Sequence, residues 1–185
     1  MKTDIVLVGV GGQGILSIST VIGLAVVSKG LNVKQSEVHG MSQRGGAVYA
    51  HLRFSDKPIA SDLIPLGKAD IVLSVEPMEA LRYIPYMKPD GWLVTNIQPF
   101  VNIPNYPDIQ SLISRLNELP NRILVDADAL ASECGSTKAS NFVMLGAAIP
   151  FISIEIEEIE RAIASIFEQK GENVVTTNIR ALQAG

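Results

Sequence analysis

DIVLVGVGGQGIL, residues 4–16, contains a strand and the turn that follows it. Ile5 to Val8 is a β-branched, apolar run with the length of a buried strand. Gly9-Val10-Gly11-Gly12-Gln13-Gly14 then fits the spacing G-x-G-x-x-G. Gly9 permits a tight turn, Gly11 lets a phosphate approach the backbone, and Gly14 allows a helix to pack closely on the strand. The stretch predicts a strand, a glycine turn and a helix whose N-terminus can hold an anion.

The residues that follow this turn complete a first structural unit. A helix is expected from about Gly11 to Lys29, with an apolar stripe formed by Ile15, Ile18, Ile22 and Ala25. Gly30 ends this helix as a C′ glycine. A second strand is expected at Asn32–Glu37, which gives a βαβ unit of ordinary size.

Further along the chain, strands and helices alternate. Strands are expected at 47–55, 71–74, 92–95 and 122–125, and helices at about 77–84, 109–119, 127–133, 141–148, 155–169 and 174–182. Within 47–55, alternation places Tyr49, His51 and Arg53 on a solvated or interfacial face. Pro89-Asp90-Gly91 is expected to be a turn that precedes the strand at 92–95.

These elements define the expected fold class. The order of strands and helices favours an α/β protein, a single three-layer Rossmann-like sandwich with a mostly parallel sheet and a helical C-terminal third. The chain has 185 residues, so we expect a single domain over 1–185. Its hydrophobic content of 47% fits parallel strands buried on both faces, or an apolar surface meant for a partner.

Composition excludes several functional classes. The formal net charge is −4 and the basic residues are scattered, which argues against nucleic-acid binding. The single cysteine, Cys134, rules out an internal disulfide, a four-cysteine zinc site and an all-cysteine iron–sulfur cluster within one chain. The longest apolar run, 142–152, contains Pro150 and is shorter than the roughly 20 residues of a membrane span. No signal peptide is recognised at Met1, so a cytoplasmic protein is expected.

The glycine turn alone leaves several ligands open. In an NAD-binding domain an acidic residue at the end of the second strand takes the ribose hydroxyls, and Glu37 lies somewhat beyond the usual spacing of about 20 residues. A stand-alone regulatory module that binds NAD or ATP is therefore one alternative. A second is an adenylating enzyme of the ubiquitin-activating type, which the doubled Gly11-Gly12 resembles. Such enzymes often carry paired zinc-ligating cysteines, which this chain cannot supply. Close strand-to-helix packing without any ligand would also require these glycines.

The segment after the second strand, together with other motifs, indicates a different class of protein. GVGGQG (9–14), EVHGMSQRGGAVYAHLR (37–53), SVEPMEALRYIPYM (74–87) and NFVMLGAAI (141–149) together resemble the gamma-subunit family of 2-oxoacid:acceptor oxidoreductases. Arg44-Gly45-Gly46 is the element shared across the family, and the longer string from Glu37 to Arg44 resembles the branch of indolepyruvate ferredoxin oxidoreductase small (beta) subunits. The resemblance covers essentially the whole chain.

This resemblance implies a reaction and a division of labour. The reaction is the oxidative decarboxylation of an aryl pyruvate such as indolepyruvate to arylacetyl-CoA and CO₂, with ferredoxin reduced and coenzyme A as co-substrate. Thiamine diphosphate, Mg and iron–sulfur clusters are expected on a large alpha subunit, because this chain lacks a G-D-G thiamine motif and cluster cysteines. The chain is then a cofactor-free subunit, inactive alone, in a complex that meets ferredoxin. A homodimer is compatible with this assignment.

The residues expected to face the active site fall into two groups. The first is the glycine turn, Gly9, Gly11, Gly12, Gln13 and Gly14; the second is the loop residues His39, Gly40, Ser42, Gln43, Arg44, Gly45 and Gly46. If both lie at the carboxyl edge of the sheet they form one rim, where Arg44 offers a fixed cation for coenzyme A phosphates or a substrate carboxylate. Arg44 binding an acidic group of its own fold or of the partner, and His39 as an ordinary loop residue, remain alternatives.

Four further polar residues have simpler explanations. Glu76 and Glu79 lie near a helix start, where the helix dipole favours acidic residues. Lys138 and Asn141 precede an apolar helix, and the start of that helix accounts for Asn141.

Overall fold

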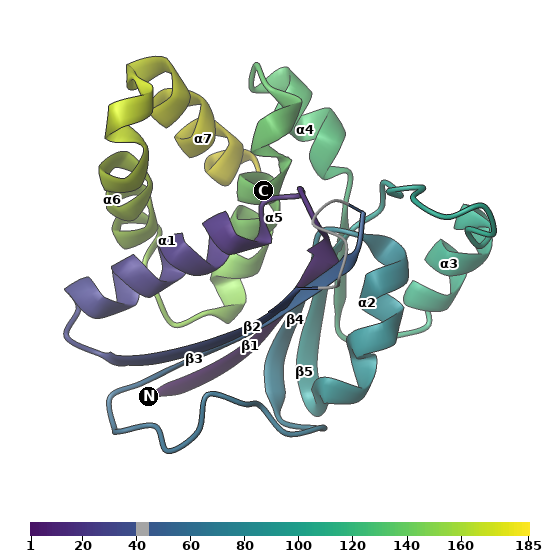
Figure 1. The fold of residues 1–185 in the computed structure, drawn as a ribbon, viewed down its shortest axis with the longest axis horizontal. Coiled ribbons are helices and arrows are strands. Elements are labelled where there is room, and N and C mark those ends of the chain that lie inside the picture. The colour runs from purple at the N-terminus through teal and green to yellow at the C-terminus, as the bar shows by residue number, and fades with distance from the viewer. Residues whose placement is uncertain (40–44) are drawn as a thin grey trace.

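The computed structural model describes residues 1–39 and 45–185 and shows a sheet with helices on both faces (Figure 1). The strands are β1 (Lys2–Val10), β2 (Asn32–His39), β3 (Ala47–Ser55), β4 (Ala69–Ser74), β5 (Met87–Asn96) and β6 (Arg122–Val125). The α-helices are α1 (Ile15–Ser28), α2 (Pro77–Tyr83), α3 (Ile109–Leu116), α4 (Ala127–Glu133), α5 (Ser140–Ala148), α6 (Ile156–Phe167) and α7 (Glu172–Ala184). Short 3₁₀ helices are η1 (Ile84–Tyr86), η2 (Thr137–Ala139), η3 (Ile149–Phe151) and η4 (Glu168–Lys170).

The strands lie in the order β2-β3-β1-β4-β5-β6. β1, β4, β5 and β6 pair in parallel, whereas β3 runs antiparallel to both β1 and β2. The expected α/β sandwich with a mostly parallel sheet is confirmed. The expected βαβ unit is modified, however, because β3 lies between β1 and β2 instead of leaving them adjacent.

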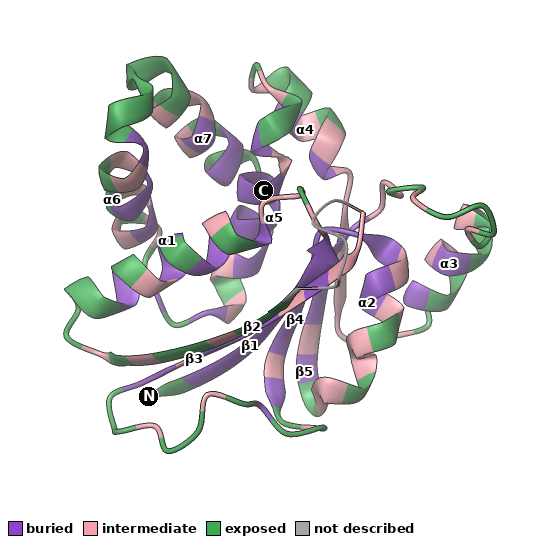
Figure 2. Cartoon of the chain, viewed as in Figure 1, coloured by how far each residue is buried: buried purple, intermediate pink, exposed green. Residues whose placement is uncertain are grey.

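Alternate residues of β1 belong to two separate apolar cores. Ile5 and Leu7 pack with α1, α5 and α6 on one face, and Val6 and Val8 pack with α2 and α3 on the other. The continuous apolar run of this strand is therefore explained by burial on both faces. Figure 2 shows this buried sheet beneath the helices that cover it. None of the described helices has the length and hydropathy that crossing a membrane requires.

The face of β3 that was expected to be solvated is largely covered. His51 is only 3% exposed, and its Nδ1 accepts a hydrogen bond from the backbone N–H of Ile64 at 2.9 Å. Tyr49 and Tyr86 pack against its ring, with centroids at 5.6 and 5.3 Å. The prediction of an outward His51 is thus wrong, because the connection to β4 folds back over this face. Burial also lowers the pKa of His51.

Pro89-Asp90-Gly91 lies inside β5 and is not the turn that was expected. The pairing of β4 with β5 shifts register between Ala69 and Ile71, which accommodates the irregular segment. A Cβ atom at Gly91 would lie 2.9 Å from the carbonyl oxygen of Ala69, so glycine allows the two strands to approach here.

Candidate functional site

The glycine turn connects β1 to α1 through two residues in the left-handed region. Gly12 has φ 101° and Gly14, the N-cap residue of α1, has φ 81°. A Cβ atom at Gly14 would lie 2.7 Å from Nδ2 of Asn141, and one at Gly9 would lie 2.8 Å from Cδ1 of Ile15. Gly9 is therefore required by close packing, and Gly14 by both its conformation and the approach of α5.

Gln13 holds this turn in place. Its Oε1 accepts a hydrogen bond from the backbone N–H of Val10 at 2.8 Å, and its Nε2 donates to the carbonyl oxygen of Val75 at 3.3 Å. Both ends of the amide are thus used within the fold, across the carboxyl ends of two parallel strands. Gln13 acts on the shape of the turn.

The turn is joined to the end of the β2–β3 connection. The N–H of Gly11 donates to the carbonyl oxygen of Gly46 at 2.9 Å, and the N–H of Gly45 to that of Gly11 at 3.5 Å. Nδ2 of Asn102 donates to the carbonyl oxygen of Gly45 at 2.5 Å. Three loops therefore meet at one edge of the sheet. His39 ends β2, whereas Gly40, Ser42, Gln43 and Arg44 lie outside the described residues.

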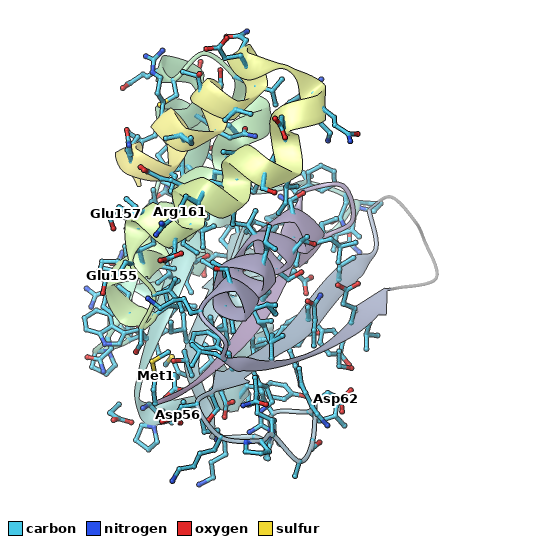
Figure 3. The ribbon with its side chains drawn as sticks, turned by 90° about the vertical axis from the view of Figure 1, so that its left-hand side faces the viewer. Met1, Asp56, Asp62, Glu155, Glu157 and Arg161 are labelled. Atoms are coloured by element: carbon cyan, nitrogen blue, oxygen red, sulfur yellow. The ribbon has the colours of Figure 1, made fainter. Side chains whose placement is uncertain are left out.

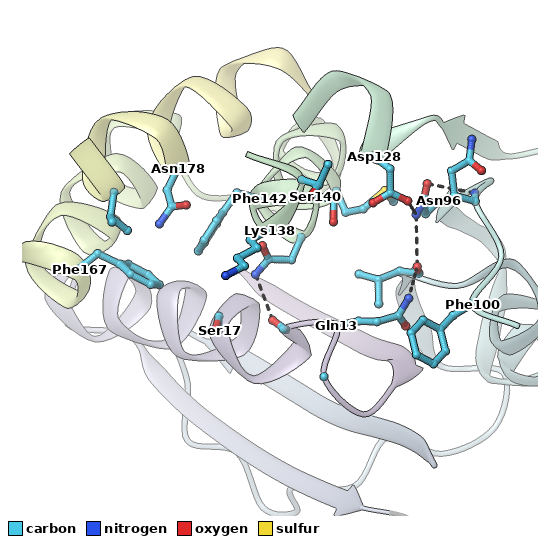
Figure 4. A pocket seen from close by; sticks show the side chains of 18 of the residues that line it. Gln13, Ser17, Asn96, Phe100, Asp128, Lys138, Ser140, Phe142, Phe167 and Asn178 are labelled. Carbon is cyan, nitrogen blue, oxygen red and sulfur yellow. Dashed lines mark hydrogen bonds between the residues drawn. The ribbon is translucent and has the colours of Figure 1, made fainter. Parts of the chain in front are cut away.

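A cavity of about 740 Å³ opens beside the glycine turn (Figure 4). It lies at the carboxyl ends of the parallel strands, the usual ligand-binding edge of an open α/β sheet. Its walls come from the glycine turn and α1, the ends of β4 and β5, the start of α4, and the helices of the C-terminal third. The lining residues are Gly12, Gln13, Gly14, Ser17, Val75, Asn96, Gln98, Pro99, Phe100, Asp128, Thr137, Lys138, Ser140, Asn141, Phe142, Met144, Phe167, Lys170, Val174 and Asn178.

The charge in this cavity is unevenly placed. Lys138 and Lys170 line it together with the N-terminus of α1, whose free N–H groups carry partial positive charge. On the side of α4, Oδ2 of Asp128 accepts a hydrogen bond from Nδ2 of Asn96 at 3.2 Å. Oδ1 of Asn96 in turn accepts from the N–H of Ala127 at 3.1 Å. The two lysines and the helix N-terminus suit an anionic group such as a phosphate.

Asn141 connects the cavity to the glycine turn. It is 5% exposed, and its Nδ2 donates to the carbonyl oxygen of Gly14 at 3.3 Å. Its Oδ1 is buried without a hydrogen-bond partner in the described structure. Because a buried polar atom is normally paired, Asn141 has an acceptor available for a donor on a bound molecule. Its role is therefore larger than the helix start that the sequence suggested.

Glu76 stabilises the loop after β5, which forms one wall of the cavity. It is fully buried, and its Oε2 accepts a hydrogen bond from the N–H of Glu79 at 2.8 Å as the N-cap of α2. Its Oε1 accepts from the N–H of Phe100 at 3.4 Å and from the hydroxyl of Tyr106. The expectation that the helix dipole explains Glu76 is incomplete, because this carboxylate also fixes the loop after β5. Burial raises the pKa of Tyr106, and the contact with Glu76 adds to this effect.

The residues of the glycine turn, which form one wall of the cavity, were predicted from the sequence, but most of the other lining residues were not. The glycine turn was recognised by its spacing, whereas Asn96, Asp128, Lys170 and Asn178 lie on separate elements without a common motif. Lys138 and Asn141 were predicted to precede an apolar helix, and Asn141 begins the stretch 141–149 that resembles the family, but neither was predicted to line the site. Polar residues at the carboxyl ends of strands, such as Asn96 at the end of β5, were the available signal.

The order of the strands argues against the interpretation of this chain as an NAD-binding domain. In a dinucleotide-binding unit the acidic residue stands on the strand beside the glycine-turn strand. Here β3 lies between β1 and β2, and Glu37 on β2 is therefore one strand further away. Nε2 of Gln35 also donates a hydrogen bond to Glu37.

Known proteins resemble this chain over its full length. It is 36% identical to the indolepyruvate oxidoreductase subunit IorB of Archaeoglobus fulgidus, with 100% of this chain and 94% of that protein covered. It is 37% identical to the subunit of the same name from Pyrococcus horikoshii, with 98% and 93% covered.

Among solved structures, the chain resembles 2-oxoglutarate:ferredoxin oxidoreductase of Magnetococcus marinus, bound to 2-oxoglutarate, coenzyme A and succinyl-CoA, with a TM-score of 0.76 at 22% identity. That likeness covers 98% of this chain and 30% of the larger one, and it establishes the fold. The family model of pyruvate ferredoxin/flavodoxin oxidoreductase matches residues 4–185. The chain therefore belongs to the pyruvate ferredoxin/flavodoxin oxidoreductase family.

Proposed function

We propose that this chain is the small, cofactor-free subunit of an oxidoreductase that converts aryl pyruvates such as indolepyruvate to arylacetyl-CoA and CO₂ and reduces ferredoxin. Two relatives at 36% and 37% identity are both named as indolepyruvate oxidoreductase subunits, which supports the aryl-pyruvate branch. The string from Glu37 to Arg44 supports the same branch.

The remaining chemistry is assigned to a larger alpha subunit. Thiamine diphosphate with Mg supplies the carbanion chemistry, and iron–sulfur clusters carry the electrons to ferredoxin. With Cys134 as its one cysteine, this chain cannot supply the thiolates of a four-cysteine cluster. The role of the small subunit is then to bind and orient a substrate that reacts on its partner.

The observation that carries this proposal is the cavity at the carboxyl edge. Lys138, Lys170 and the N-terminus of α1 all line it with positive charge, and coenzyme A carries several phosphates. The unpaired Oδ1 of Asn141 offers an acceptor in the same wall. We infer that the cavity holds the nucleotide half of coenzyme A, with the glycine turn beside it. A solved relative contains bound coenzyme A, which supports this ligand class.

Kinetics of the assembled complex test this role. Changing Lys138 or Lys170 to alanine should raise the KM for coenzyme A by about tenfold with kcat nearly unchanged, because a charge-assisted contact to a phosphate is lost. The KM for the 2-oxoacid should stay the same. Lys29→Ala is a matched control, because Lys29 lies at the far end of α1 and does not line the cavity.

An unchanged KM for coenzyme A in both variants, with the complex intact, would contradict the assignment of the cavity. Arg44→Ala tests the separate hypothesis, drawn from the sequence, that Arg44 contacts coenzyme A phosphates or the substrate: a raised KM for coenzyme A or for the 2-oxoacid is expected. The subunit assignment has its own test: the isolated chain should show no turnover, and it should co-purify with a much larger, brown polypeptide. Turnover by the isolated chain would refute it.

A further inference from the structure

Within the described residues, the outer side of the edge strand β2 pairs with no other strand. β2 ends the strand order of the sheet and pairs with β3 along its inner side over eight residues, from Asn32 with Ser55 to His39 with Val48. The backbone groups on the outer side of such a strand form a template for another strand. Val38 on this strand is 42% exposed, although it is a large apolar residue.

An uncharged flank of α1 runs beside this edge. Nε2 of Gln35 on β2 donates to the hydroxyl of Ser19 at 3.0 Å, which marks the side of α1 that faces β2. Leu16 lies three residues before Ser19 and Val27 two turns after it, and they are 40% and 55% exposed. No residue of α1 is charged. An uncharged helix flank that exposes large apolar side chains favours a contact made in an assembly.

The charges along β2 are compatible with pairing to a copy of itself. In an antiparallel pair with Ser36 opposite Ser36, Lys34 stands opposite Val38 of the other copy, and Gln35 stands opposite Glu37. Gln35 and Glu37 already form a hydrogen bond within one strand. No two like charges are opposed in this register, so the lysine that often protects an edge strand does not prevent this particular pairing.

We propose that a second copy of this chain binds along β2, with the two β2 strands antiparallel about a two-fold axis at Ser36 and the α1 flanks closing over the junction. The closed two-fold contact uses the same surface on both copies and leaves no further edge for growth at β2. Because the two sheets then run in opposite directions, the carboxyl edges lie at opposite ends of the dimer. Each cavity stays open to its own catalytic partner.

Opposite charges at position 38 give a direct test, since Val38 would lie across from Lys34. Val38→Glu should tighten self-association of the full-length chain and Val38→Lys should weaken it, each by about threefold to tenfold at low salt. Both variants remove the same apolar side chain, so each is the control for the other. Sedimentation equilibrium of the isolated chain measures the dimer dissociation constant, and thermal unfolding verifies that both variants are folded.

A charge exchange completes the test. Adding Lys34→Glu to Val38→Lys should restore the affinity, because opposite charges then face each other again. Monomeric wild-type chain throughout the micromolar range, as expected if a different protein occupies β2, would overturn the proposal. A dimer whose affinity responds equally to Val38→Glu and Val38→Lys would also overturn it, because the contact would then lie elsewhere.

Discussion

Gly12 and Gly14 both have a positive φ, of 101° and 81°, but different surroundings. The space around Gly12 is open, whereas a Cβ atom at Gly14 would meet Asn141 at 2.7 Å. Gly12→Ala should therefore cost only the conformational strain of about 1 kcal/mol. Gly14→Ala should cost roughly 1–3 kcal/mol more because of the added clash. Urea unfolding measures both changes.

A double variant identifies the source of that difference. Adding Asn141→Ala to Gly14→Ala removes the clashing amide and should leave mainly the strain, once the loss from Asn141→Ala alone is subtracted. Equal losses in the two single glycine variants would show that Asn141 moves aside without cost.

The buried carboxyl group of Glu79 makes the free energy of unfolding depend on pH. Burial raises its pKa, Glu76 adds to this effect, and Arg82, whose Nη1 lies 3.2 Å from Oε1, opposes it. The folded state therefore binds the proton more tightly than the unfolded state. The contribution to stability is complete below the ordinary glutamate pKa of about 4.3, and it is lost as the pH rises through the raised value.

The variant Glu79→Gln should remove this loss, so that its stability falls less between acidic and neutral pH than that of the wild type. Urea unfolding at a series of pH values is the measurement. Glu158→Gln serves as the control, because Glu158 also pairs with an arginine three residues later but is only half-buried, whereas Glu79 is buried. Parallel pH profiles of wild type and Glu79→Gln would refute the assignment.

Two glycines inside helices show how an element depends on its neighbours. Gly23 in α1 has open space around its Cβ position, whereas at Gly146 in α5 the added atom would overlap the carbonyl oxygen of Leu182 in α7. Gly23→Ala should stabilise the chain by about 0.5–1 kcal/mol through helix propensity. Gly146→Ala should destabilise it despite the same gain, because α5 and α7 must separate.

Thermal or urea unfolding distinguishes these signs, and Ser165→Ala on the exposed side of α6 is a control for propensity alone. Stabilisation by both glycine substitutions would show that α7 adjusts freely. Nothing in the sequence separates the two glycines, since each lies in an apolar helical run.

The spacing of apolar residues, glycines and prolines predicted most helices and strands, because interactions between residues close in sequence largely determine where these elements begin and end. The strand Arg122–Val125 and the helix Ala127–Glu133 have the predicted bounds. Gly30 ends α1 as expected: its N–H donates to the carbonyl oxygen of Val27, and that of Leu31 to Val26. Pro89-Asp90-Gly91 was misread because the bulge that holds it in β5 depends on pairing with β4, which is remote in sequence.

At the scale of the whole molecule, the cavity joins the two ends of the chain. Its glycine turn comes within the first 14 residues, while Lys138, Lys170 and Asn178 come from the C-terminal third (Figure 4). Figure 3, turned from the view of Figure 1, shows α6 with Arg161 packed beside α1 over the sheet. This arrangement brings the C-terminal helices to the N-terminus of α1, so that a motif of six residues becomes one wall of a site.

The sequence by itself determined the α/β class, the positions of most elements and the glycine turn, because these follow from periodicity, strand length and the conformational freedom of glycine. It also determined the family, through motifs spread along the whole chain. Only the tertiary structure decided that β3 lies between β1 and β2, that His51 is buried, that Asn141 contacts the glycine turn, and that two lysines line the same cavity. Those features depend on contacts between residues far apart in sequence, and no local pattern encodes which distant side chains share a wall.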